Sequence, residues 1–393
     1  ARERAEQERR AFEQIAEAQA TTLEGLDPHE IGASIVGAME RQLAEANAGP
    51  DGPGAVDGQP AEAIFAALAS WTDPTAAAAR VIEERMLAPV AADVETSLDG
   101  LAYAQYYVLF GIGQSRVNLG LLDEAIAAGE RALEAARAIE RDPHLPIVNA
   151  GNLVVRALLE QERHAEAERR AAPLLEHART HLGPDDETTL TLEFNLVTAI
   201  QGQERFNEAL ALWEDHLARV RARHGDDSAA VMDVRRMLAS NLERTGEAER
   251  AYELKREVHA WRAANLDPDD PLVANSALEI ALTAFRLERY AEAEAGMAQA
   301  VRDFTRTLGA DHAWTGNAEG LRARAIGRLG RHEEAAAANA ELLARLRPLH
   351  GDDHWVVQRN VRHRVVILTE WDRDAGTAVH AAEIASLEAE LGD

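Results

Sequence analysis

Six alanines recur at intervals of 42 residues along this chain: Ala125, Ala167, Ala209, Ala251, Ala293 and Ala335. Most of them follow a short turn, as in the segment from Gly120 to Ala125. Short loops that end in aspartate recur at the same interval, at 182–185, 224–227, 266–269, 308–311 and 350–353. A fixed period over more than half of a chain is the signature of stacked structural repeats. We therefore predict a solenoid, in which each repeat buries its apolar face only against its neighbours.

Each period is predicted to contain two helices, because alanine, leucine, glutamate and arginine dominate the composition and all four favour helix. In the third period we place a first helix over 187–202 and a second over 206–222. The alanine lies where the second helix crosses the first closely, so that a larger side chain would push the pair apart. The acidic loop then caps the next first helix. The caps are predicted at Asp185 or Asp186, Asp227 or Ser228, Asp269 or Asp270, Asp311 and Asp353.

The predicted organisation has four parts. Residues 1–46 read as charged N-terminal helices, and 47–60 as a loop rich in glycine and proline. Residues 61–102 form a helical cap with a bend near Pro89. About seven repeats then fill 103–393, and the last is degenerate because Thr377 takes the place of the alanine.

Composition narrows the functional classes. The net charge of −27 argues against nucleic-acid binding, which needs a basic surface. The absence of cysteine excludes disulfides and thiolate metal sites. No apolar run approaches the ~18 residues of a membrane span. We found no kinase motif, Walker loop or nucleophile elbow. The chain is therefore predicted to be non-catalytic and to need no cofactor.

The repeats resemble the 42-residue tetratricopeptide repeats of kinesin light chains and of many bacterial proteins. The resemblance rests on the loops ending in aspartate, on the turn glycines, and on the aromatic or histidine residue that opens each second helix. These residues are Gly120, Gly246, Gly330, Phe206, Tyr290, His164 and His332. Glutamate replaces the turn glycine at 162, 204 and 288. The resemblance implies an all-α, right-handed superhelix that recognises proteins or peptides.

The N-terminal flank resembles a narrower group. Segments 25–29, 66–90 and 120–125 are similar to the region after the membrane span of bacterial transmembrane serine/threonine kinases with tetratricopeptide tails. This implies a sensor region on the periplasmic side of the inner membrane, tethered through helix 1–22, with a kinase domain upstream. The signal would pass by a change of superhelix curvature or by homodimerisation. The chain begins at Ala1 within a charged helical run, so we expect a fragment of a longer protein.

A free-standing cytoplasmic scaffold or adaptor is the alternative. An apolar stretch of about 20 residues just upstream of Ala1 would favour the receptor.

The first helices are predicted to line a concave groove. Projecting the repeat phase onto them places eight arginines but only four acids inward, although the whole chain is strongly acidic. Arginine suits carboxylates, asparagine suits a peptide backbone, and aromatic rings suit an apolar anchor. The predicted groove residues are Asn149, Asn152, Arg156, Arg236, Arg244, Asn275, Arg286, Asn317, Arg324, Arg328, Arg359, Arg362, Tyr107, Phe110 and Phe194.

The corresponding hypothesis is an acidic peptide bound in the groove. Arg244, Arg286 and Arg328 share one column, which we call the arginine ladder. The alternative is that these arginines pair with acids of neighbouring repeats and only stabilise the stack.

A different class, a metal-assisted enzyme, has weaker support. His177 and His181 stand four residues apart on a second helix, a spacing that can bind one metal ion. No third ligand is evident nearby in the sequence, so no metal site is predicted. A solvated helix end explains the pair, because cations are favourable near a helix C-terminus.

Overall fold

The computed structural model describes residues 79–392, and all their regular elements are helices. Residues 79–82 are α-helical and lead into a π-helical turn, η1 (Glu83–Leu87). The helix α5 (Ala88–Ser97) follows, and its second residue, Pro89, has no N–H to donate. The predicted first helices are α6 (Ala102–Asn118), α8 (His144–Glu160), α10 (Glu187–Gly202), α12 (Ala229–Thr245), α14 (Pro271–Arg286), α16 (Ala313–Arg328) and α18 (Trp355–Ala375). The second helices are α7 (Leu122–Arg137), α9 (His164–His181), α11 (Phe206–His224), α13 (Ala248–Asn265), α15 (Tyr290–Leu308), α17 (His332–His350) and α19 (Ala381–Leu391).

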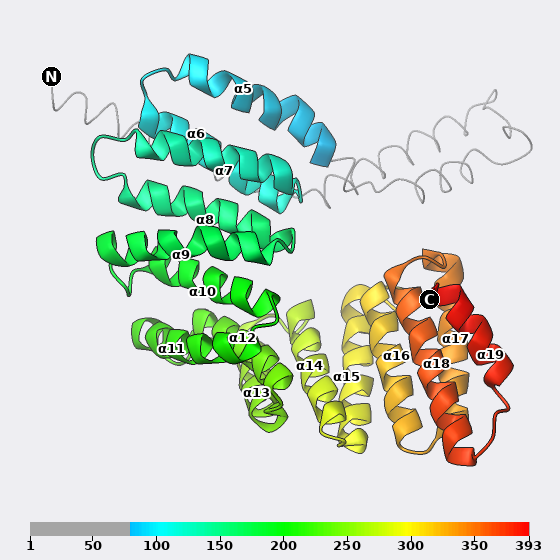
Figure 1. Ribbon diagram of the computed structural model, residues 1–393. Coiled ribbons are helices and arrows are strands. Elements are labelled where there is room, and N and C mark those ends of the chain that lie inside the picture. Colours follow the sequence, from blue (N-terminus) through cyan, green and yellow to red (C-terminus); the bar gives the residue numbers. More distant parts are fainter. Residues whose placement is uncertain (1–78, 393) are drawn as a thin grey trace, which may run out of the picture. The chain divides into compact units, whose positions relative to one another are not determined.

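This arrangement confirms the predicted all-α repeat fold, with helices laid side by side (Figure 1). The predicted helices 1–46, the loop 47–60 and residues 61–78 of the cap lie outside the described residues. In the described part, no helix is both long and apolar enough to cross a bilayer.

Chain contacts divide the described residues into two compact units, at the junction between Arg205 and Phe206. In unit 1, α5 packs against α6, and the helices from α6 to α10 pack in succession. Its apolar core continues through three adjoining clusters. The guanidinium of Arg116 on α6 donates to the Glu83 carboxylate at 2.9 Å, which fixes η1 to the first repeat.

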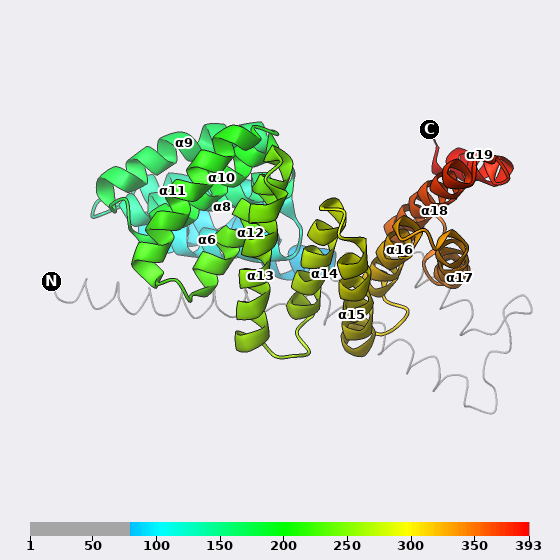
Figure 2. The same cartoon turned by 90° about the horizontal axis from the view of Figure 1, so that it is seen from below.

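Unit 2 contains α11 to α19, and its helices also pack in succession. One core cluster of unit 2 lies between α13 and α16, and another extends from α16 to α19. The first helices α16 and α18 contact each other directly, and they lie next to each other in both views (Figure 1 and Figure 2). A Cβ at Gly320 would lie only 1.7 Å from Oδ1 of Asn360, so glycine is what permits this close approach.

The alanine column has the role that the sequence predicted. All six alanines are fully buried, with 0% exposure, and each lies three residues after the start of a second helix. In the third period the first helix has the predicted bounds, and the second ends two residues later, at His224. Thr377, at the corresponding place in the last period, lies in the loop between α18 and α19 rather than in a helix.

The caps follow the period more closely than predicted. Asp186, Ser228 and Asp270 accept from backbone N–H groups at the next helix start. The prediction of Asp311 and Asp353 was wrong, because His312 and His354 accept there through Nδ1. All five caps are spaced by 42 residues. A histidine Nδ1 lies as near the backbone as an aspartate oxygen, so it can perform the same task.

The glutamates that replace glycine in the turns adopt left-handed backbone conformations. The φ of Glu162 is +57°, that of Glu204 is +61° and that of Glu288 is +60°, compared with +71° at Gly120. A side chain with a Cβ costs roughly 1–2 kcal/mol in this region.

We expect Glu288→Gly to raise the free energy of unfolding by about 1 kcal/mol, because glycine adopts the left-handed turn without that cost. Urea unfolding followed by tryptophan fluorescence measures this, since all described tryptophans lie in unit 2. The control is Glu341→Gly in the exposed middle of α17, which should lose about 1 kcal/mol. Equal effects of the two substitutions would refute the explanation.

Candidate functional site

The residues predicted to line a groove in unit 1 are largely engaged in packing between helices. Tyr107 and Phe110 belong to an aromatic cluster with Tyr106, whose ring stacks on that of Phe110 at 5.6 Å between centroids. Burial raises the pKa of Tyr106 to about 12, although a hydrogen bond with Asn149 opposes the shift. Phe194 on α10 is partly buried. Tyr107 and Phe110 also pack against the core cluster that α6 shares with α7 and α8.

Two polar groove candidates in unit 1 also bridge first helices. Asn152 is buried, and its Oδ1 accepts from the side-chain amide of Asn195 at 2.7 Å. The guanidinium of Arg156 donates to the side-chain carbonyl of Gln114 at 2.9 Å. Asn152, which was predicted to contact a peptide backbone, therefore contacts the neighbouring first helix instead.

Unit 2 contains the arginine ladder. Arg244 lies over the Phe206 ring, with its guanidinium carbon 4.7 Å from the centroid. Arg286 pairs with Glu243, and Arg328 pairs with Glu370 at 3.3 Å. These are the contacts with acids of neighbouring repeats that the alternative explanation predicted. The Arg286 side chain is nonetheless 57% exposed, so the pairing does not bury it.

The remaining asparagines of unit 2 offer little to a ligand. Asn317 on α16 is buried, with 3% exposure, and Asn275 on α14 donates to Glu279 of the same helix at 3.3 Å. Arg236 on α12 is partly buried. The groove residues predicted from the repeat period therefore lie on two sides of the first helices. One side faces solvent, and the other faces the next repeat.

Three predicted arginines do come together in one cavity, which we call the arginine pocket. It has a volume of about 510 Å³ and lies on α16 and α18. Its lining residues are Arg324, Trp355, Arg359, Arg362, His363 and Val366. Arg359 and Arg362 are exposed, and neither forms an ion pair with any acid of the described residues. The pocket therefore has positive charge that the repeats themselves do not neutralise.

Burial and neighbouring positive charges both lower the pKa of Arg324 in this pocket. Burial lowers the pKa of Arg324, Glu370 opposes the shift, and the neighbouring Arg328 and Arg359 add to it. Arginine remains charged at any physiological pH. The guanidinium carbon of Arg324 also lies 5.3 Å from the centroid of the Phe285 ring. An anion in the pocket would relieve repulsion among three guanidinium groups.

His363 supplies a neutral wall to the arginine pocket. Burial lowers the pKa of His363 to about 3, with Arg324 and Arg359 adding to the shift. Its Nδ1 has no hydrogen-bond partner in the described structure. A neutral imidazole beside three arginines can donate or accept a hydrogen bond without adding to the repulsion.

An aromatic pair that we did not predict lies beside the pocket. The rings of Trp314 and Trp355 are 5.7 Å apart between centroids, and both side chains are more than 40% exposed. Trp355 also lines the pocket. Each tryptophan comes within two residues of a histidine cap, which is the only sequence signal that could have pointed to the pair. Tryptophan and arginine are the residue types most enriched at the energetic centres of protein interfaces.

The histidines of unit 1 require a correction. We saw no third ligand near His177 and His181, but His144 at the start of α8 lies beside both. Burial lowers the pKa of His177, and the neighbouring imidazoles of His181 and His144 add to the shift. No sequence motif links His144 to His177, which lies 33 positions later.

The comparisons with known proteins agree with this architecture. The family model for tetratricopeptide repeats matches residues 272–347, which include most of α14 to α17. The chain carries tetratricopeptide repeats. No curated protein matches the sequence.

Three solved structures resemble the chain. A signal-transduction ATPase with a tetratricopeptide sensor, from Pyrococcus horikoshii, has a TM-score of 0.58 at 16% identity, over 93% of this chain and 53% of that one. BtubC (BKLC) from P. vanneervenii has a TM-score of 0.50 at 16% identity, over 57% of this chain and 92% of that one. The repeats of a putative kinesin light chain from Podospora anserina have a TM-score of 0.48 at 20% identity, over 51% and 95%. At these identities the first two likenesses show the fold alone.

Proposed function

We propose that this chain is a non-catalytic recognition domain whose tetratricopeptide repeats bind an acidic protein segment at the arginine pocket. The observation that carries the proposal is the unpaired charge of Arg359 and Arg362 beside the exposed tryptophan pair. Arginine forks fit carboxylates with two parallel hydrogen bonds, and hydrogen bonds between charged groups are the stronger ones. Trp314 and Trp355 would receive an apolar side chain next to the acidic one.

The overall negative charge of the chain means that an acidic ligand must be held by a local site. A net charge of −27 repels acidic ligands at long range, so binding must depend on close contacts. The cavity is also larger than a single carboxylate needs, which favours a segment with several contacts.

We expect the double substitution Arg359→Glu and Arg362→Glu to weaken binding of an acidic peptide at least tenfold, because each charged hydrogen bond contributes about 1.5–3 kcal/mol. The probe is a fluorescein-labelled peptide in which glutamate alternates with leucine, followed by fluorescence anisotropy. The melting temperature should not fall, since neither arginine is ion-paired.

The matched control is Arg256→Glu with Arg302→Glu, two exposed positions on the second helices α13 and α15. The ion pair that this breaks, Arg256 with Glu253 on the same helix, is exposed on both sides and contributes little to stability. It changes the net charge by the same amount away from the pocket. Equal weakening by both pairs would show a long-range charge effect and would overturn the proposal. The ladder is a poorer target, because substituting Arg286 or Arg328 also breaks ion pairs with Glu243 or Glu370.

The cellular setting is a further part of the proposal and rests on the N-terminal flank. Its resemblance to transmembrane kinases supports a sensor region on the periplasmic side of a bacterial inner membrane; the alternative is a cytoplasmic scaffold. The flank up to residue 78 lies outside the described residues. Reading the gene upstream of Ala1 tests the choice, since an apolar stretch of about 20 residues followed upstream by kinase motifs would support the sensor.

A further inference from the structure

Three histidines from two helices meet at one end of unit 1, and we call them the histidine cluster. His144 is the first residue of α8, while His177 and His181 are one turn apart at the end of α9. The two helices pack against each other as consecutive elements, so the start of α8 lies beside the end of α9. Residues four apart on a helix share one face, which turns both α9 histidines toward the same neighbour.

The distances within the cluster are close to those of a coordinated ion. Nδ1 of His144 and Nε2 of His177 are 3.2 Å apart. One nitrogen of each of the three rings lies within 4.8 Å of the other two. Tetrahedral zinc with Zn–N bonds of about 2.0–2.1 Å separates its ligand nitrogens by about 3.3 Å. One pair is already near that separation, and the third ring has a nitrogen about 1.5 Å or less beyond it.

A hydrogen bond between two imidazoles explains only part of this geometry. It accounts for the contact between His144 and His177, but not for His181, whose ring stacks on that of His144 with centroids 3.8 Å apart. None of the three is ion-paired with an acid in the described structure. Three nitrogen donors therefore share one small volume with no carboxylate among them.

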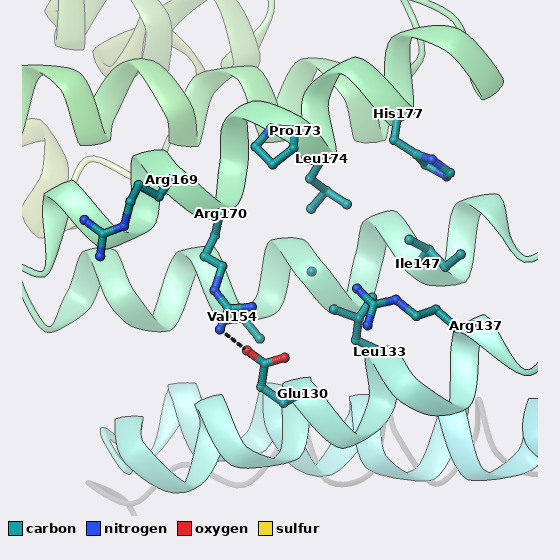
Figure 3. A pocket seen from close by; sticks show the side chains of 11 residues that line it. Glu130, Leu133, Arg137, Ile147, Val154, Arg169, Arg170, Pro173, Leu174 and His177 are labelled. Atoms are coloured by element: carbon teal, nitrogen blue, oxygen red, sulfur yellow. Dashed lines mark ion pairs between the residues drawn. The ribbon is translucent and has the colours of Figure 1, made fainter.

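The surroundings leave room for a fourth ligand. His181 is exposed, whereas His144 and His177 are partly buried. His177 also lines a cavity of about 340 Å³ between α7, α8 and α9. Figure 3 shows it at one end of that cavity beside Ile147, away from the ion pair of Arg170 with Glu130. Water can reach the cluster from the side of His181.

We propose that the histidine cluster binds one borderline divalent transition-metal ion, of which Zn²⁺ is the type, with water as the fourth ligand. Imidazole nitrogen suits Zn²⁺, Cu²⁺ and Ni²⁺, whereas Mg²⁺ and Ca²⁺ require oxygen ligands that are missing here. The carbonyl end of α9 also favours a cation. The bound ion would link the start of α8 to the end of α9 and stabilise the hairpin by mass action. The site lies in unit 1 and does not depend on the arginine pocket of unit 2.

The test uses the full chain without a histidine tag, stripped by a chelator and then titrated with Zn²⁺ in a calorimeter. We expect one equivalent of Zn²⁺ per chain, with a dissociation constant of about 1 μM or below. Co²⁺ should give the visible absorption of a tetrahedral nitrogen site. His144→Gln, His177→Gln and His181→Gln should each weaken Zn²⁺ binding at least tenfold, while metal-free melting temperatures and circular dichroism stay unchanged.

The control is His350→Gln in unit 2. His350 stacks on His354 at 4.8 Å between centroids, with the same spacing of four residues, but the described structure places no third histidine beside them. This variant should bind Zn²⁺ like the parent chain. The proposal is overturned if Zn²⁺ binds as tightly to His144→Gln as to the parent, or if the parent binds none at micromolar concentrations. If one histidine variant loses Zn²⁺ binding but also changes its dichroism spectrum, the other two decide the question. At least one of them must keep the parent spectrum and still bind Zn²⁺ weakly.

Discussion

Glu243→Gln is expected to lower the free energy of unfolding by about 3–5 kcal/mol, the cost of leaving a buried charge without its partner. Nζ of Lys255 donates to the Glu243 carboxylate at 2.8 Å, and both side chains are more than 90% buried. The Thr283 hydroxyl donates to the same oxygen at 2.5 Å, and Arg286 pairs with the other. Glutamine keeps the shape of the side chain but leaves Lys255, the one lysine of the chain, unneutralised.

The carboxyl group of Glu243 is ionised at neutral pH. Burial by itself raises the pKa of Glu243, but hydrogen bonds from Lys255 and Thr283 and the charge of Arg286 lower it below its ordinary value. The carboxylate therefore links α12, α13 and α14 as an anion at neutral pH.

The effect is measured by urea unfolding at pH 7, followed by tryptophan fluorescence. Combining Glu243→Gln with Lys255→Met should recover most of the loss, because no unpaired lysine then remains. Lys255→Met alone should cost less, since Arg286 still neutralises Glu243. If Glu243→Gln costs less than about 1 kcal/mol, as an exposed ion pair would, the buried network does not hold these helices.

Acidification is expected to destabilise unit 2 through His363 by about 2 kcal/mol at pH 5. Burial lowers the pKa of His363 to about 3 in the folded chain, compared with an ordinary 6.5. Between these values the unfolded chain binds a proton that the folded chain does not. The contribution of His363 is therefore unaffected above pH 6.5, and stability falls by about 1.4 kcal/mol per pH unit below it.

The measurement compares the pH dependence of unfolding in the parent chain and in His363→Gln, by urea titration from pH 7 to pH 5. The variant should lose about 2 kcal/mol less over this range, whatever its stability at pH 7. The control is Leu349→Gln on the exposed surface of α17, which changes no titratable group and should follow the slope of the parent. Superimposable slopes for the parent and His363→Gln would contradict the predicted burial of a neutral imidazole between α16 and α18.

The local rules of the repeat could be predicted from the sequence. The alanine spacing identified the start of the second helices α7, α9, α11, α13, α15 and α17, and the first helix of the third period has its predicted bounds. These features depend on short sequence patterns that recur in each repeat, so a prediction made for one repeat applies to the others. The caps were placed correctly in three periods, whereas His312 and His354 replaced Asp311 and Asp353, because loop geometry decides which side chain reaches the backbone.

The repeat period could not predict which of the inward positions are open to a ligand. Asn152 and Asn317 are buried between first helices, while Arg359 and Arg362 of the same predicted set are exposed. The difference comes from how closely adjacent first helices approach, and at α16 and α18 this depends on Gly320. The period does not encode such distances.

The amino-acid sequence by itself therefore determined the repeat, its helices and the close crossing at each alanine. Only the tertiary structure decided which distant side chains meet: the tryptophans beside the arginine pocket, Lys255 with Glu243, and His144 with the two histidines of α9. Helix formation and crossing are governed by residues a few positions apart. Contacts between different helices depend on helix rotation and separation, which arise from the packing of the whole unit.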